Sequence, residues 1–478
     1  MEWRHQVKGN TNLSIESVIK QPVATVFRRA FIKRRSPVTG LFESDWVEIT
    51  SDVKSWGKVS SQIDSVRLYT FTFGNMKMVM HNDDGRYNPE DEESSLWYGY
   101  LNQQRTLVKV EAGFVNRTQI DGVWYEGEYP TQVYWDQALW DFETSVWDQD
   151  ITPIVFTGVV SGDISLMDTN EVSLNIKPLT SVFQDYPARN LTGWTSTGFT
   201  ASNFITLLRD QTDGSGGFVF RNFFNNTTTY WDISATSVVY SNLNTSTAKD
   251  VIDSTVWDII EKLSEAENYV PYVTRDGMFK FVSREANTVG VSYEFHGAGS
   301  PDSYYGSTVT KLNSAGRKIS KYYSRVQVKW KEEDTSTSYE VVESQFLISG
   351  NSNPWVLGTR TLEITNLFIP SAAVANSLAT AIFNDYSALK KEIDFSTTFV
   401  PHLDLLDRFA FYYDPTVYTV NSLWDEYNWA FDSTDTTSDL IFDYSKGDAI
   451  NFSGQEFKFL SFEIDLDNLS NRFIAREV

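Results

Sequence analysis

Apolar side chains recur at every second position in many short runs of this chain. Residues 26–33 and 66–73 both alternate in this way, and so does the run Ile393, Phe395, Thr397 and Phe399. A period of two places successive side chains on opposite faces of a sheet, whereas a helix needs a period of 3.6. Strands also favour aromatic and β-branched residues, and the chain holds 32 Phe, 24 Tyr and 15 Trp. The sequence therefore predicts a mainly β (α+β) fold.

Three segments have helical spacing instead. They are 201–209, 256–265 and the Ala-rich 372–389. The segment 256–265 has apolar residues at i, i+3, i+4 and i+7 behind cap candidates at 254–255. It leads into a predicted hairpin with its turn at 276–277, so the middle of the chain is expected to mix helices and strands.

The two ends of the chain resemble each other in the order and spacing of their strands. The matching segments lie 300 or 301 positions apart: 108–112 with 409–413, 163–166 with 463–466, and 172–174 with 473–475. Between the first and second strands, each copy has an insert in which aromatic residues precede Asp. Alternation alone produces weak matches, so chance is a rival explanation, but an insert at the same topological place favours an internal repeat.

A chain of 478 residues exceeds the size at which one hydrophobic core stops growing. We therefore expect two similar tube-type β-barrel domains flanking a mixed α/β middle domain. The predicted boundaries are 1–190 for the first barrel with its Trp-Asp insert at 121–150, 191–310 for the middle domain, and 311–478 for the second barrel with helix 372–389 and insert 422–448.

Composition argues against several classes of function. The chain has no cysteine, which rules out disulfides, thiolate zinc sites and cysteine nucleophiles. Its net charge of −23 opposes nucleic-acid binding as the main role, because neutralising phosphates requires clustered Lys and Arg. The four His residues are scattered and no carboxylate pair stands out, so we expect no metal site, no cofactor and no enzymatic activity. We also expect neither a membrane span nor a signal peptide.

A polar segment follows the first strands and has a distinctive order of residues. Turn signals at 84–85 and 88–89 predict an ordered surface loop. Its carboxylates could bind Ca²⁺, but their spacing differs from that of an EF-hand loop, and a turn capped by its own Asn and Asp side chains is the preferred interpretation. The motif residues are Asn82, Asp84, Gly85, Tyr87, Pro89, Trp97, Tyr98 and Gly99.

This loop, with the turn and the strand from Val108 that follow it, resembles a recurrent segment of bacteriophage tail proteins. The order of the later elements is similar to that of the tail hub or baseplate hub family, whose members are tail-tip structural proteins. The resemblance implies a homotrimer that adapts a six-fold tail tube to a three-fold tip and leaves a channel for DNA ejection. It also implies a location in the virion after assembly in the bacterial cytoplasm, with contacts to a tail tube or distal tail protein, a tape-measure protein, and a fibre or spike.

The aromatic residues of the two inserts are candidate interface residues, because Trp and Tyr dominate interaction hot spots. They are Trp135, Trp140, Trp147, Trp424 and Trp429. Aromatic rings beside carboxylates also suit sugars. The alternative function is therefore a host-contacting tail protein that binds or cleaves a cell-surface glycan.

Overall fold

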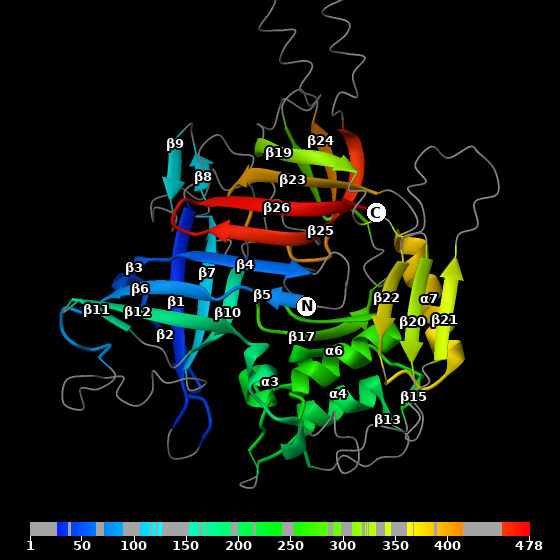
Figure 1. The fold of residues 1–478 in the computed structure, drawn as a ribbon. Coiled ribbons are helices and arrows are strands. Elements are labelled where there is room, and N and C mark those ends of the chain that lie inside the picture. Colours follow the sequence, from blue (N-terminus) through cyan, green and yellow to red (C-terminus); the bar gives the residue numbers. More distant parts are fainter. Residues whose placement is uncertain are drawn as a thin grey trace, which may run out of the picture.

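The structure is a computed structural model of the chain. It describes residues 26–36, 40–63, 71–88, 106–114, 117–120, 123–126, 153–161, 165–168, 170–192, 199–213, 217–240, 253–284, 290–297, 308–317, 321, 323, 325–330, 340–345, 361–366, 368–386, 390–413 and 452–478. Two large curled sheets dominate these residues, which confirms the predicted mainly β fold with two barrel-type sheets (Figure 1).

The first sheet has eight strands, all from the N-terminal part of the chain. Its order is β2 (Val47–Glu48), β1 (Val26–Arg34), β7 (Thr106–Phe114), β10 (Ile154–Val160), β12 (Glu171–Pro178), β6 (Met76–His81) and β3 (Val53–Ser55), and β11 (Ser165–Asp168) pairs with β12 off this path. Alternation along these strands buries an aliphatic core that includes Ala30, Ile32, Met76, Met78, Val108, Val110, Leu174 and Ile176.

The second sheet also has eight strands, and its core is aromatic. Its order is β18 (Tyr293–His296), β24 (Arg408–Tyr413), β25 (Phe452–Asp465), β26 (Ser470–Glu477), β23 (Lys391–Thr398) and β19 (Val309–Arg317). The hairpin of β4 (Lys58–Ile63) and β5 (Phe71–Phe73) joins this sheet through β25. Packed rings fill the core, among them Phe295, Phe395, Phe409, Phe411, Phe459 and Phe473.

The two sheets share four antiparallel strands in the same spatial order. These strands lie in the order β7-β10-β12-β6 in the first sheet and β24-β25-β26-β23 in the second. Their order along the chain also matches, since β6, β7, β10 and β12 correspond in turn to β23, β24, β25 and β26. Each predicted insert falls between the same two strands, β7 and β10 or β24 and β25. The flanks differ, because β1 is antiparallel to β7 whereas β18 is parallel to β24.

The middle of the chain forms a smaller α/β unit below the two sheets (Figure 1). It contains α3 (Ser181–Gln184), α4 (Ala201–Asp210), α6 (Val256–Glu267), the pair β13 (Phe199–Thr200) and β15 (Val239–Tyr240), and the sheet β14 (Trp231–Ile233), β17 (Phe279–Ser283) and β16 (Tyr269–Val273). The predicted helices at 201–209 and 256–265 are therefore confirmed. Thr255 caps α6 through a reciprocal capping box with Asp258, which explains why the helix begins there.

Another small unit lies between β19 and β23 in the chain. It pairs β21 (Glu340–Gln345), β20 (Arg325–Trp330) and β22 (Thr361–Thr365), with α7 (Ala372–Tyr386) packed on β20 and β21 (Figure 1). A separate hairpin joins β8 (Arg117–Ile120) and β9 (Val123–Glu126). Among the described residues, no helix is both long and apolar enough to cross a membrane.

The division between sheets differs from the predicted boundaries at two places. The β4–β5 hairpin belongs to the second sheet although the sequence placed 1–190 in the first domain. Strand β18 also belongs to the second sheet although 191–310 was assigned to the middle domain. Both differences arise from pairing between strands far apart in the chain, which alternation within a single strand does not encode.

Candidate functional site: the junctions between the two sheets

The loop motif that the sequence singled out is a tightly bonded turn. Asn82 Oδ1 accepts a hydrogen bond of 2.8 Å from the Tyr87 backbone N–H, and Gly85 has a φ of +73°. Asp84 accepts from the Arg86 side chain at 2.7 Å, and the buried Tyr87 hydroxyl donates to Asp52. Burial, followed by that bond to a carboxylate, raises the pKa of Tyr87. The Asn and Asp side chains thus serve the turn itself, which is the preferred interpretation of the motif.

The remaining candidate residues from the sequence lie outside the described residues. These are Pro89, Trp97, Tyr98 and Gly99 of the loop motif and the insert aromatics Trp135, Trp140, Trp147, Trp424 and Trp429. Their assignment as assembly residues stays a prediction. The described residues instead bring together three junctions that fix the two sheets to each other and to the smaller units.

The first junction lies where the chain passes from the first sheet to the second, between β3 and β4. The carboxylate of Asp467, in the β25–β26 turn, accepts hydrogen bonds from the backbone N–H of Trp56 at 2.9 Å and of Gly57 at 3.1 Å. Arg28 of β1 donates to the Leu466 carbonyl at 2.6 Å. Gly57 has a φ of +69°, which favours glycine, and a Cβ there would collide with a backbone carbonyl of β6. A turn of the second sheet is therefore clamped onto the first.

The second junction is centred on Arg275, at the tip of the β16–β17 hairpin of the middle unit. Its backbone carbonyl accepts from the Thr157 hydroxyl of the first sheet at 2.8 Å. Its guanidinium donates to the Pro401 carbonyl and pairs with Asp404 at 3.2 Å, both between β23 and β24. The same group lies 4.1 Å from the ring centroid of Phe462 in β25. Only 6% of Arg275 is exposed, so a single buried residue of the middle unit contacts both sheets, the first through its backbone carbonyl and the second through its side chain.

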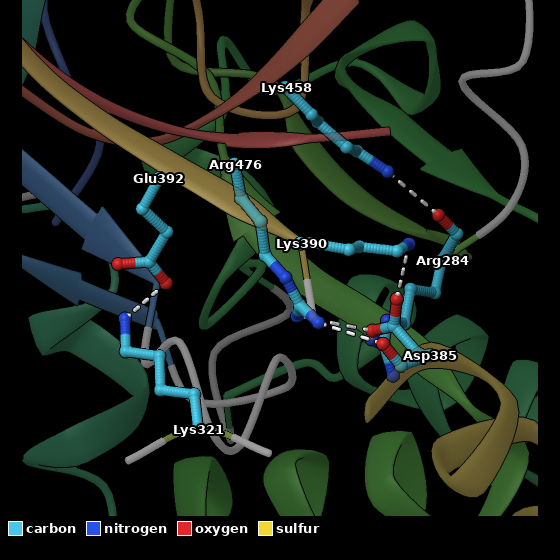
Figure 2. Close-up of polar contacts among 7 residues, drawn as sticks. All are labelled: Arg284, Lys321, Asp385, Lys390, Glu392, Lys458 and Arg476. Carbon is cyan, nitrogen blue, oxygen red and sulfur yellow. Dashed lines mark hydrogen bonds and ion pairs between the residues drawn. The ribbon is translucent and has the colours of Figure 1, made fainter. Parts of the chain in front are cut away.

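The third junction is a buried charge cluster that joins the middle unit, α7 and the second sheet (Figure 2). The carboxylate of Asp385, at the end of α7, pairs with Arg284, with Lys390 at 2.9 Å and with Arg476 at 3.5 Å. Burial alone would raise the pKa of Asp385, but the three cations outweigh it and lower the pKa below its usual value. Four chain segments therefore depend on one carboxylate.

A further cation, Lys458, lies beside Arg284 in this cluster. Lys458 of β25 donates to the Arg284 carbonyl at 3.1 Å (Figure 2). Burial, followed by repulsion from Arg284 and Arg408, lowers the pKa of Lys458 to about 8. Nearby, Lys321 donates to the buried Glu392 at 2.5 Å, which ties the chain beyond β19 to β23.

No group of three or more His, Asp or Glu residues that could hold a metal occurs within the part of the chain that the structure describes. The charged side chains of the junctions pair with one another or hydrogen-bond to backbone groups. What the arrangement does is hold two similar sheets at a fixed position relative to each other.

Comparison with known proteins gives similarity of structure alone. No family model matches the chain, and no curated protein matches it. Similar solved structures include a tail protein from Neisseria meningitidis MC58, at 9% identity and a TM-score of 0.47, covering 94% of this chain and 96% of that one. They also include a prophage tail protein from Listeria monocytogenes EGD-e, at 10% identity and a TM-score of 0.45, covering 94% of each chain. A 43 kDa tail protein of prophage MuSo2 from Shewanella oneidensis has 9% identity and a TM-score of 0.44, covering 94% of this chain and 98% of that one.

All three structures are of tail proteins, the class of protein to which the loop motif is similar.

The junction residues were not found from the sequence. Gly57 and Asp467 carry no local signal that they meet, because they are 410 positions apart. A turn was predicted at 276–277, but nothing in the sequence marks the neighbouring Arg275 as buried. Asp385 reads as an ordinary polar residue near the end of an Ala-rich helix.

Proposed function

We propose that the chain is a structural subunit of a bacteriophage tail, and that three copies form a hub ring at its distal end. The observation that carries this proposal is the shared strand order of the two sheets. A ring of three chains with two similar sheets each presents six similar units about one axis. Such a ring can meet a six-fold tube on one side and a three-fold tip on the other.

The three junctions support this proposal because a ring needs the two sheets of each chain at a constant angle. If the sheets moved freely, the six units would not share a radius. The clamp at Gly57, the buried Arg275 and the Asp385 cluster each connect elements that are distant in the chain. Buried, multiply bonded charges are costly to separate, so the two sheets should move as one body.

The partners that follow from this role are a tail tube, distal tail or tape-measure protein on one side and a fibre or spike on the other. DNA would pass through the ring without binding, and the net charge of −23 supports that, because like charges repel. The proposed role is structural and not catalytic, in a virion that assembles in the bacterial cytoplasm.

Stoichiometry tests the proposal. Quantitative mass spectrometry of purified tails, with the six-copy tube ring as the internal standard, should give three copies of this chain per tail. The purified chain should also form a species of three times its mass of 54.6 kDa in mass photometry. One copy or six copies per tail would reject the trimeric hub.

A further inference from the structure

A groove lies between the first sheet and the middle unit, beside the second junction, whose Thr157 also lines it. It has a volume of about 330 Å³, at the lower end of the roughly 300–1,000 Å³ typical of ligand pockets. Strands β1, β7 and β10 form one wall, the 41–46 turn forms the second, and residues 222–230 with the 276–277 turn form the third. Its walls therefore come from parts of the chain that the fold holds rigidly together.

Two lysines meet around one aromatic ring in this groove. The ammonium of Lys33 lies 5.7 Å and that of Lys109 lies 5.2 Å from the ring centroid of Trp46. Lys109 is paired with Glu111 at 2.7 Å. The Lys33 ammonium has no hydrogen-bond or ion-pair partner among the described residues. Burial and, less strongly, Lys109 lower its pKa against the opposite effect of Asp45. A carboxylate entering the groove would give Lys33 the partner that it lacks.

Neutral polar groups and further aromatic rings also line the groove. Asn225 and Asn226 lie in a turn with φ values of 55° and 50°, a conformation that asparagine tolerates better than most residues. Both side chains are exposed at the rim, beside Tyr230 and Ser44. Amides and hydroxyls can both donate and accept hydrogen bonds, which suits a ligand with several hydroxyl groups.

Two carboxylates also line the groove, and each already has a partner. Glu43 accepts two hydrogen bonds from Arg34, at 2.6 and 2.9 Å. Asp276 accepts from the Thr274 hydroxyl. The charge of Glu43 is therefore offset by Arg34, whereas Asp276, whose partner is a neutral hydroxyl, keeps its negative charge. Of the two lysines that line the groove, Lys33 is the one without an ion pair among the described residues.

We propose that this groove binds an acidic saccharide, with the sugar carboxylate on Lys33 and the sugar hydroxyls on the Asn225–Asn226 rim. Trp46 and Tyr230 supply the apolar surface on which a sugar ring packs. The site is separate from the Trp-Asp inserts, where the sequence placed its candidate sugar platform. It is also independent of the hub proposal, because a monomer would retain all its residues.

The test is ligand-observed NMR on the full chain with D-glucuronic acid and, as the neutral match, D-glucose. We expect binding of glucuronic acid that weakens by about tenfold or more in Lys33→Gln, the loss typical of one charge-assisted hydrogen bond. Trp46→Leu should abolish the saturation transfer. The control Lys311→Gln removes an exposed lysine of β19 outside the groove and should bind like the unaltered chain.

Several outcomes would overturn the proposal. Equal binding of glucose would remove the role of the carboxylate, and an unchanged affinity in Lys33→Gln would remove the site. A synthetic peptide of residues 144–150, which carries Trp147 and Asp148, is the second probe. Binding of the peptide in place of the sugar would make the groove a protein-docking site. Circular dichroism of each variant separates lost binding from lost folding.

Discussion

Replacing Asp385 with Asn tests whether the buried charge cluster holds its segments together. The change keeps the size of the side chain and removes the one carboxylate that Arg284, Arg476 and Lys390 share. The side chains of Arg284 and Arg476 are only 14% and 8% exposed. Removing one partner from a buried ion pair typically costs about 3–5 kcal/mol. Arg476 keeps its hydrogen bond of 2.8 Å to the Asp385 backbone carbonyl in the variant, but the carboxylate that it shares with Arg284 is gone. We expect a loss of that size.

The matched control is Asp394→Asn in β23. Asp394 also accepts two hydrogen bonds from an arginine, Arg472, but that side chain is 56% exposed. An exposed pair contributes about 0–1 kcal/mol, so this variant should be nearly neutral. The two substitutions are chemically identical. They differ in the burial of the arginines and in the number of cations that they leave behind, three at Asp385 and one at Asp394.

Hydrogen exchange with mass spectrometry measures the effect where it occurs. Peptides from α7 and β26 should lose about two to three and a half orders of magnitude of protection in Asp385→Asn, the equivalent of 3–5 kcal/mol. The cations lower the pKa of Asp385, so its contribution is present above the usual carboxyl pKa and is lost as pH falls through the lowered value. The difference in protection between Asp385→Asn and the unaltered chain should therefore persist at pH 7 and decrease only at acidic pH. Equal effects of the two variants would refute the reasoning.

Three further changes have defined outcomes. Gly57→Ala should destabilise the fold by more than about 2 kcal/mol, because a left-handed residue costs about 1–2 kcal/mol and the added Cβ collides with β6. The control Gly316→Ala has open space at its Cβ and should leave the melting temperature unchanged. Tyr87→Phe removes the hydroxyl that donates to Asp52 and should cost about 1–3 kcal/mol in urea unfolding, with no loss if that bond is absent. Burial raises the pKa of Glu261 to about 7, so its folded form keeps a proton that the unfolded form releases near pH 4.5, and stability should fall as pH rises between those values. Glu261→Gln should flatten that slope and stabilise the middle unit at pH 8, and an unchanged pH profile would contradict the assignment.

Local patterns in the sequence predicted individual elements well. The apolar spacing and cap before 256–265 correspond to α6, and the Ala-rich segment corresponds to α7 over 372–386. The alternating run from Ile393 lies in β23. These elements were accessible because their signals lie within one turn or one strand. The repeated spacing of 300 or 301 positions also anticipated the shared strand order, because both copies keep their inward-facing positions apolar.

Long-range placement was not accessible in the same way. The β4–β5 hairpin alternates like any strand pair, so nothing local shows that it extends the second sheet and not the first. Arg275 and Asp385 became visible as junction residues only once their partners were in place, because a buried charge looks like a surface charge until its environment is known. Trp135 and Trp424 of the inserts lie outside the described residues, so their role in assembly stays a prediction.

The most direct test of the account is a cryo-EM map of the tail end that contains this chain. It should show three copies around the axis, with the β7-β10-β12-β6 and β24-β25-β26-β23 sheets alternating at one radius as six similar units. The surface facing the channel should be polar and neutral or acidic. A map with six copies, or with the two sheets of a chain at unequal radii, would contradict the account, and so would a continuous stripe of Lys and Arg along the channel.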